Sequence, residues 1–185
     1  MLNPFLDRFI YTNGLKYSKN QFLLLNTPLA LIPTDVLCAI ASIPDPVQNR
    51  VLYYAVKKQV LEQLMPTFTL STSSELNVKF LAEFFSACGI GLVEIVHFDP
   101  AHLRAILVLE QNPIAERLAG KAHAPVDHVL RGIFAGVFSS IFKTDIDCVE
   151  HQCMALNHKN CEFILKPSHE FDYGKNEPRE QLELK

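Results

Sequence analysis

The sequence predicts an α+β fold, in which a helical N-terminal half packs on an antiparallel sheet of two β-hairpins with a long helix between them. Apolar residues recur at helical spacing over 46–65, 74–88 and 125–142, which places them on one face of a helix. Two further stretches, 91–110 and 144–166, each contain two β-like runs around a turn signal. The 185 residues are enough to bury the core of one domain.

The composition is that of an ordinary globular protein, with 49% apolar and 20% charged residues. A net charge of −3 gives no basic footprint, which excludes nucleic acid as the expected partner. The first residues do not read as an export signal, because Pro4, Asp7 and Arg8 interrupt them. The apolar run at 22–33 is too short to span a bilayer. We therefore expect a cytoplasmic protein with reduced cysteines.

Residues 1–45 are expected to form an N-terminal extension. It would contain a short helix, the turn signal Asn13-Gly14, an extended segment at 21–32 and a helix opened by Pro33. The domain proper is expected to run from 46 to 166.

The stretch 46–65 is predicted to be a helix, with Pro46 in its first turn and Pro66 ending it. Tyr53 and Tyr54 suit an interface with a partner. Its predicted apolar face comprises Val47, Val51, Leu52, Ala55, Val56, Val60 and Leu64.

The next helix is predicted over 74–88, with Ser and Thr before it as caps and Gly89 after it. A hairpin follows, with strands at 91–98 and 102–110, and then a short helix at 113–120. The apolar stripe of the helix comprises Leu76, Phe80, Leu81, Phe84 and Phe85.

The clearest element is the helix at 125–142, whose apolar pattern has no interruption. Gly132 and Gly136 each cost it about 1 kcal/mol of helix propensity relative to Ala. Two explanations stay open: another backbone approaches this face closely, or the glycines make room for Phe rings.

The last hairpin is predicted from strands at 144–156 and 161–166, joined by a turn in which Asn157 tolerates a left-handed conformation. The tail at 167–185 loses the apolar pattern. We expect it to be mobile, or to be a short helix docked on a partner.

Three of the five cysteines lie in CVEHQCMALNHKNCEF, residues 148–163. Zinc is usually held by four thiolate, imidazole or carboxylate donors. Cys153 and Cys161 stand on opposite arms of the predicted hairpin, and Glu150 is three residues before Cys153. A fourth donor would come from Asp127 or His128, at the start of the preceding helix. Spacing alone also allows these thiols to be core residues.

Three cysteines are expected in the core. Cys148 shares a strand face with Ile146, and Cys38 and Cys88 fall in apolar helical patterns. A disulfide is the least favoured interpretation of the cluster, because the cysteine count is odd and no export signal precedes it.

HVLRGIFAGVFSSIF followed by DIDCVEHQCMALNHKNCEFIL resembles the 4-vinyl-reductase domain family. This ligand-binding fold is related to the small TRAPP subunits and to the sensor domains of phenol-responsive bacterial activators. The matching positions are Arg131, Gly132, Gly136, Glu150, Cys153, Ala155, Cys161 and Phe163.

The resemblance implies a structural zinc site of Glu150, Cys153 and Cys161, with Asp127 at the position of the family's first cysteine. Asp127 is a departure, although a carboxylate is still an acceptable donor, and His128 could substitute for it. A second departure is the absence of Trp, which the phenol-sensing members use in their pocket. Phenol as the ligand is therefore in doubt.

The function implied by the resemblance is a sensor or regulatory domain that encloses a small apolar or aromatic ligand between the sheet and the Phe-rich helices. Such a domain is expected to form a homodimer through its N-terminal helices and to act on an effector partner protein. Alternatives are an accessory enzyme of tetrapyrrole metabolism, for which no catalytic constellation is readable, and a TRAPP-like assembly scaffold without ligand. The expected pocket walls are Phe80, Phe84, Phe85, Phe134 and Phe138.

Overall fold

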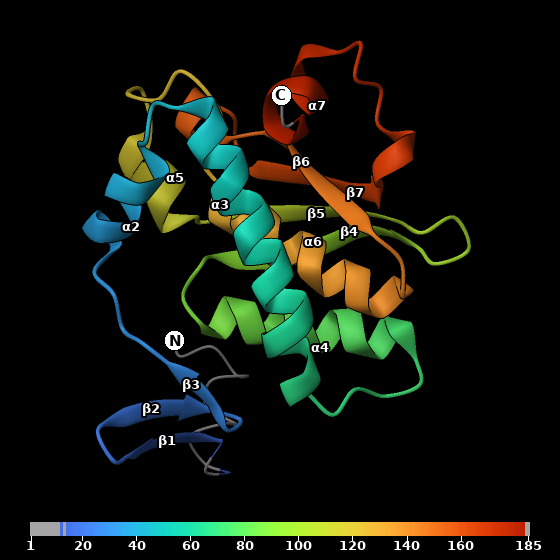
Figure 1. The fold of residues 1–185 in the computed structure, drawn as a ribbon. Coiled ribbons are helices and arrows are strands. Elements are labelled where there is room, and N and C mark those ends of the chain that lie inside the picture. The colour runs from blue at the N-terminus through green and yellow to red at the C-terminus, as the bar shows by residue number, and fades with distance from the viewer. Residues whose placement is uncertain (1–11, 13, 184–185) are drawn as a thin grey trace.

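The computed structural model describes residue 12 and residues 14–183, and Figure 1 shows its fold. A four-stranded antiparallel sheet with the order β4-β5-β7-β6 lies at its centre. The predicted hairpins are β4–β5 and β6–β7, and pairing of β5 with β7 joins them. The α+β fold class is therefore confirmed. The strands are β4 (Leu92–Asp99), β5 (Arg104–Glu110), β6 (Ile146–Gln152) and β7 (Cys161–Pro167).

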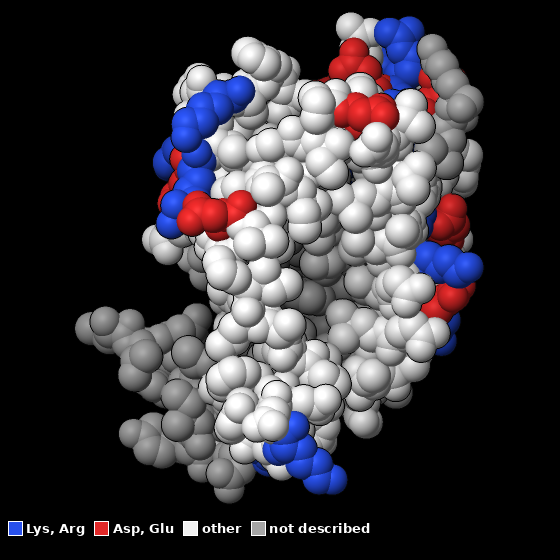
Figure 2. All heavy atoms as spheres, turned by 60° about the vertical axis from the view of Figure 1, so that its left-hand side comes forward, with Lys and Arg blue, Asp and Glu red and all other residues white. Residues whose placement is uncertain are grey.

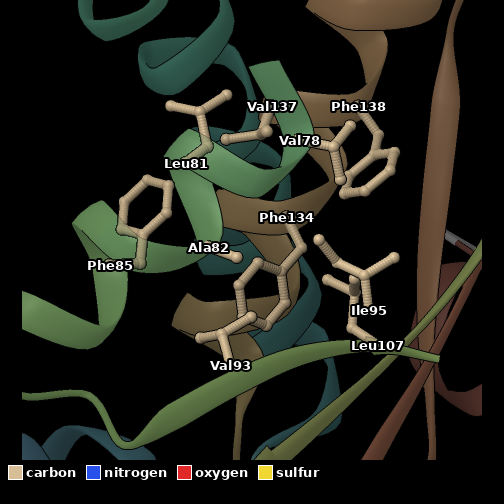
Figure 3. Close-up of a pocket in the computed structure, with 10 residues that line it drawn as sticks. All are labelled: Val78, Leu81, Ala82, Phe85, Val93, Ile95, Leu107, Phe134, Val137 and Phe138. Carbon is tan, nitrogen blue, oxygen red and sulfur yellow. The ribbon is translucent and has the colours of Figure 1, made fainter. Parts of the chain in front are cut away.

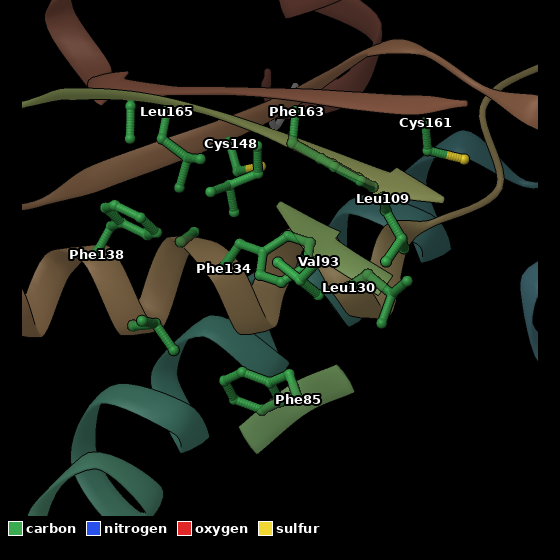
Figure 4. Close-up of a cluster of buried hydrophobic side chains, with 14 of the residues drawn as sticks. Phe85, Val93, Leu109, Leu130, Phe134, Phe138, Cys148, Cys161, Phe163 and Leu165 are labelled. Carbon is green, nitrogen blue, oxygen red and sulfur yellow. The ribbon is translucent and has the colours of Figure 1, made fainter. Parts of the chain in front are cut away.

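Helix α6 (His128–Phe142) separates the two hairpins in the chain and packs on one face of the sheet. Figure 4 shows its apolar side chains pointing toward the strands. The ring centroids of Phe134 and Phe163 are 5.1 Å apart at an interplanar angle of 70°, an edge-to-face arrangement that aromatic pairs favour. Cys148 is fully buried in this core, as predicted.

Helix α3 (Pro46–Gln59) crosses α6 on the side away from the sheet. A Cβ atom added at Gly132 would lie 2.7 Å from the carbonyl oxygen of Tyr53, and one added at Gly136 would lie 2.7 Å from that of Lys57. Close approach of another backbone therefore accounts for both glycines.

The buried face of α3 differs from the predicted one. Val47 and Val51 of the predicted apolar face are 50% and 56% exposed. Arg50, Tyr53 and Lys57 are buried instead. The reason is that the long polar side chains reach past α6 to β6 and α7, where hydrogen bonds satisfy their tips. Tyr53 is fully buried, so the structure does not offer it to a partner.

Helix α4 (Ser74–Ala87) packs against β4 and α6. Its N-terminus is capped as predicted, because the Ser73 hydroxyl accepts a hydrogen bond from the Leu76 amide at 3.3 Å. Gly89 follows the helix with a φ of +83°. Leu76 of the predicted apolar stripe is 62% exposed and does not join the core.

Before α3, the chain forms a small antiparallel sheet that the sequence did not predict. Its strands are β1 (Leu15–Ser18), β2 (Gln21–Leu24) and β3 (Thr27–Leu29), so only part of the extended segment at 21–32 is strand. The short helix expected before the Asn13-Gly14 turn lies outside the described residues. Helix α2 (Thr34–Ala41) forms where predicted and packs against α5 (Pro113–Leu118).

The tail does not match the expectation of mobility. Its helix α7 (Asn176–Leu182) packs against β6 and α3 of the same chain. Leu182 is only 2% exposed, and its carbonyl oxygen accepts a hydrogen bond from the Tyr54 hydroxyl at 2.9 Å. Within the described part of the chain, no helix combines the length and hydropathy that a membrane crossing requires.

The crossing of α3 and α6 leads to a first prediction. The Gly136→Ala variant should lose about 2 kcal/mol or more of unfolding free energy, because the added methyl overlaps the Lys57 carbonyl. The gain of about 1 kcal/mol in helix propensity does not offset this loss. Urea denaturation measures the difference. Ser140→Ala, at a half-buried position of the same helix, is the control, and equal stability of both variants would contradict the close crossing.

Candidate functional site

Four buried donors meet where α6 begins and the last hairpin turns. Asp127 immediately precedes α6, Glu150 stands at an irregularity in the β6–β7 pairing, Cys153 follows β6 and Cys161 begins β7. One ligand atom from each lies within 4.8 Å of the others. The residues are at most 2% exposed. The structure thus brings together the four residues that the sequence analysis selected as metal ligands.

The donor set leaves two carboxylate oxygens without a partner. Asp127 Oδ1 and Glu150 Oε1 are buried and make no hydrogen bond. A buried, unsatisfied acceptor is costly, and more so when it carries charge. A cation between these oxygens and the two sulfurs would remove that cost. The residues present therefore fit a metal ion that accepts oxygen and sulfur ligands, as zinc does.

A surrounding set of hydrogen bonds orients the donors. Asn112 Nδ2 donates to Asp127 Oδ2 at 2.8 Å and to Cys161 Sγ at 3.6 Å. The Asp127 amide donates to Glu150 Oε2 at 3.1 Å, and the Met154 amide donates to Cys161 Sγ at 3.3 Å. Such outer partners fix the rotamers of metal ligands.

Asn112 also explains how α5 contributes to the site. Its Oδ1 accepts hydrogen bonds from the Ile114 and Ala115 amides and so caps α5, while its amide nitrogen serves the donor cluster. The sequence analysis missed this residue. Asn before Pro113 is a recognisable helix start, but that signal does not say where the second end of the amide points.

Burial sets the protonation of the donors in the metal-free protein. It raises the pKa of Asp127 and, together with the neighbouring Asp127 carboxylate, raises that of Glu150 well above its usual range. A hydrogen bond with Cys161 lowers the pKa of the Cys153 thiol to about 7 and raises that of Cys161. A metal ion would therefore have to displace protons to bind here.

His128, the predicted substitute donor, is not part of the four-residue group. It is 8% exposed, and its Nδ1 has no hydrogen-bond partner. Burial lowers its pKa to about 3, with a smaller contribution from the nearby Arg131 cation. His128 is therefore a buried neutral imidazole beside the cluster.

Gln181 of α7 supports the site from the side of β6. Its Oε1 accepts from the Glu150 amide and its Nε2 donates to the Glu150 carbonyl, both at 2.9 Å. Arg131 Nη1 donates to the same Oε1 at 2.7 Å, and the Arg131 guanidinium lies 4.7 Å from the centroid of the Tyr53 ring. Sequence reasoning noted Arg131 only for its family match and did not find Gln181.

An apolar cavity lies between α4, α6 and the sheet, away from the donor cluster (Figure 3). Three of the five predicted wall residues, Phe85, Phe134 and Phe138, line it. Phe80 and Phe84 do not. They pack instead against Phe68, with ring centroids 5.9 and 5.0 Å from it, because the helix turns this edge of its stripe toward the segment before α4.

The fold is that of solved sensory and reductase-family domains. The phenol-responsive sensory domain of the transcription activator PoxR, solved with phenol, matches with a TM-score of 0.74 and 16% identity over 97% of this chain and 96% of that one. A vinyl-4-reductase family protein from Methanocaldococcus jannaschii matches with a TM-score of 0.50 and 19% identity over 75% and 83%. A trafficking protein particle complex subunit 3 from Naegleria fowleri, covalently bound to palmitic acid, gives 0.46 and 14% over 72% and 93%.

At the level of sequence, the family model of the vinyl-4-reductase domain matches residues 106–167. This range contains all four donors, and the match confirms the predicted resemblance to the 4-vinyl-reductase domain family for this part of the chain. No curated protein is a significant match. At the identities found, the solved structures show a common fold.

The burial of His128 gives a pH prediction. The unfolded chain protonates His128 below about pH 6.5, whereas the folded protein keeps it neutral to about pH 3. Its contribution to stability is therefore lost as the pH falls from about 6.5 toward 3. The loss should be about 2 kcal/mol between pH 7 and pH 5. Urea unfolding of the parent and of His128→Phe at both pH values, with a chelator present, measures it.

His128→Phe should lose about 2 kcal/mol less than the parent over this interval, since other titrating groups are common to both proteins. If both proteins lose the same free energy, His128 is not kept neutral by the fold.

Proposed function

We propose that this protein is a sensor-type domain that binds a small apolar molecule, and that a structural zinc ion fastens its last hairpin to helix α6. The observation that carries the metal part is the cluster of Asp127, Glu150, Cys153 and Cys161, buried and with two unpartnered carboxylate oxygens. The ligand part is supported by the apolar cavity and by the fold shared with a phenol-responsive sensory domain.

The proposed zinc shell has four protein donors and no open position, which is typical of structural sites. Two thiolates and two carboxylates carry more negative charge than zinc neutralises. The Arg131 cation acts on this charge and lowers the pKa of Asp127. The N-terminus of α6, which Asp127 precedes, presents a partial positive charge to the same cluster.

Zinc at this place would join three segments that are far apart in the chain. Asp127 belongs to the start of α6, Glu150 and Cys153 to the end of β6, and Cys161 to the start of β7. Fixing them would hold α6 on the sheet, and α6 supplies Phe134, Val137 and Phe138 to the cavity. The metal would thus stabilise one wall of the ligand site without touching the ligand.

Metal analysis tests the proposal. Protein purified without a metal-affinity column should contain about one zinc per chain. Cys153→Ser should lose that metal, because it removes a donor of the cluster. Cys88→Ser, which changes a half-buried thiol that is not part of the cluster, should keep it. Elemental analysis gives the stoichiometry.

A chelator should also lower the melting temperature of the parent and of Cys88→Ser, but not that of Cys153→Ser. Absence of zinc from all three proteins would refute the metal part and leave the thiols as core residues.

A second function, assembly of two copies, is favoured by exposed apolar side chains on the N-terminal helices. Figure 2 shows a broad face without Lys, Arg, Asp or Glu, with charged side chains gathered at its margins. Exposed apolar surface of this extent marks interaction sites. We propose that it forms a homodimer interface. The exposed apolar residues of this region are Leu31, Ile32, Val36, Ile40, Val47 and Val51.

The dimer is tested by placing a charge in the proposed interface. Val51→Glu should shift the protein from dimer to monomer in sedimentation velocity, since Val51 is 56% exposed and an unpaired carboxylate would be buried on association. Val96→Glu is the matched control, at a 55% exposed position on β4, and should stay dimeric. A parent protein that sediments as a monomer would rule out this interface.

A further inference from the structure

The apolar cavity carries information about the chemistry of its ligand. Its lining consists only of apolar side chains, and Figure 3 shows them converging from α4, α6, β4 and β5 without a polar atom among them. The lining residues are Val78, Leu81, Ala82, Phe85, Val93, Ile95, Leu107, Phe134, Val137 and Phe138.

The polar group of Ser86, next to the lining residue Phe85, is already engaged. The Ser86 hydroxyl donates to the Ala82 carbonyl at 2.8 Å and accepts from the Val93 amide at 2.9 Å. It ties α4 to β4 at the edge of the cavity. A ligand hydroxyl in this space would therefore leave water without gaining a hydrogen bond from a lining side chain.

The cavity has an entrance on the side of α4 and β4. A groove of about 530 Å³ runs between these elements and shares the side chains of Val78, Ala82, Val93 and Ile95 with the cavity. These four residues form a common wall. In the present conformation, the cavity behind it offers about 10 Å³ to the centre of a water-sized sphere, which is room for about one water molecule. A larger ligand has to displace this wall.

The rim of the groove is acidic. Glu75 and Glu83 of α4 and Glu94 of β4 line it, with Lys79 as the one cation among the residues that line it. A carboxylate ligand approaching along this route would meet net negative charge. The rim therefore disfavours anions, and the interior disfavours groups that need a hydrogen bond.

We propose that the ligand is a small neutral hydrocarbon, such as a single aromatic ring without a hydroxyl group, and that it enters through the groove between α4 and β4. Phe85, Phe134 and Phe138 offer it ring contacts inside the cavity. The inference rests on the proposed ligand-binding function and specifies its substrate class. It also agrees with the absence of Trp from the chain.

Toluene, phenol and benzoate test the proposal, because toluene and phenol have the same shape and differ by a methyl against a hydroxyl. Toluene should bind the full-length protein at least about tenfold more tightly than phenol, since the hydroxyl loses its hydrogen bonds with water. Benzoate should not bind. Titration calorimetry gives the affinities, and methyl NMR shifts of Val78 and Val93 report where the ligand lies.

Two variants locate the site. Ala82→Phe fills the wall shared by groove and cavity and should weaken toluene binding at least about tenfold, while Val96→Phe, on the exposed part of β4, should not. Thermal unfolding checks that both variants fold. If Ala82→Phe does not fold, the methyl shifts of the parent protein decide the location.

The outcomes separate the inference from the proposed function. Phenol binding as tightly as toluene would overturn the inference and leave ligand binding intact. Toluene binding that does not shift the methyls of Val78 and Val93 would place the ligand elsewhere and also overturn it. No binding of any of the three compounds would refute both the inference and the proposed function of sensing an aromatic molecule.

Discussion

The close crossing of α3 over α6 is the constraint on which the rest of the structure depends. Gly132 and Gly136 let the two helix backbones meet without intervening side chains. Because α3 lies so near, its side chains reach the sheet on the other side of α6. Tyr53 and Lys57 each contact Asp147 of β6 at 2.7 Å. A helix held one side chain further away would leave Asp147 buried without partners, at considerable cost.

The same crossing accounts for a buried cation. Arg131 is 1% exposed and receives hydrogen-bond acceptors from Gln181 and from the Cys148 carbonyl rather than from a carboxylate. The ring of Tyr53, placed by α3, covers its guanidinium. The negative charge of Asp127 and Glu150 nearby complements it. The acidic cluster and the arginine therefore stabilise each other across the start of α6, and neither group is a self-contained feature.

Much of this arrangement could be predicted from the sequence, because it depends on local patterns. The helix at 128–142 and both hairpins have strong periodicities and short turns, and the structure places them where expected. Glu150, Cys153 and Cys161 lie within twelve residues of one another, so their proximity could be inferred from one hairpin. Asp127 was selected through the family resemblance and through its place at the start of the helix.

The features that were missed depend on contacts between distant parts of the chain. Asn112 and Gln181 meet the donor cluster across 49 and 31 residues, and neither carries a signal of its own. The buried face of α3 was assigned to the wrong residues because hydropathy does not anticipate that Tyr53 and Lys57 find partners on β6. The sheet β1–β3 was missed because its turns use Lys19-Asn20 and Leu25-Asn26 at positive φ, instead of an Asn-Gly pair.

The position of Gln181 gives the end of the described chain an unexpected role. Glu150 takes part in two contacts at once, with its carboxylate in the donor cluster and its backbone bound to the side chain of Gln181. The amide of Gln181 continues the sheet where β6 has an outer edge, so α7 takes the place of a neighbouring strand. Any event that moves Glu150 changes the free energy with which α7 is held, and detachment of α7 acts on Glu150 to the same extent. The last helix is therefore a mechanical lever on the interior of the domain.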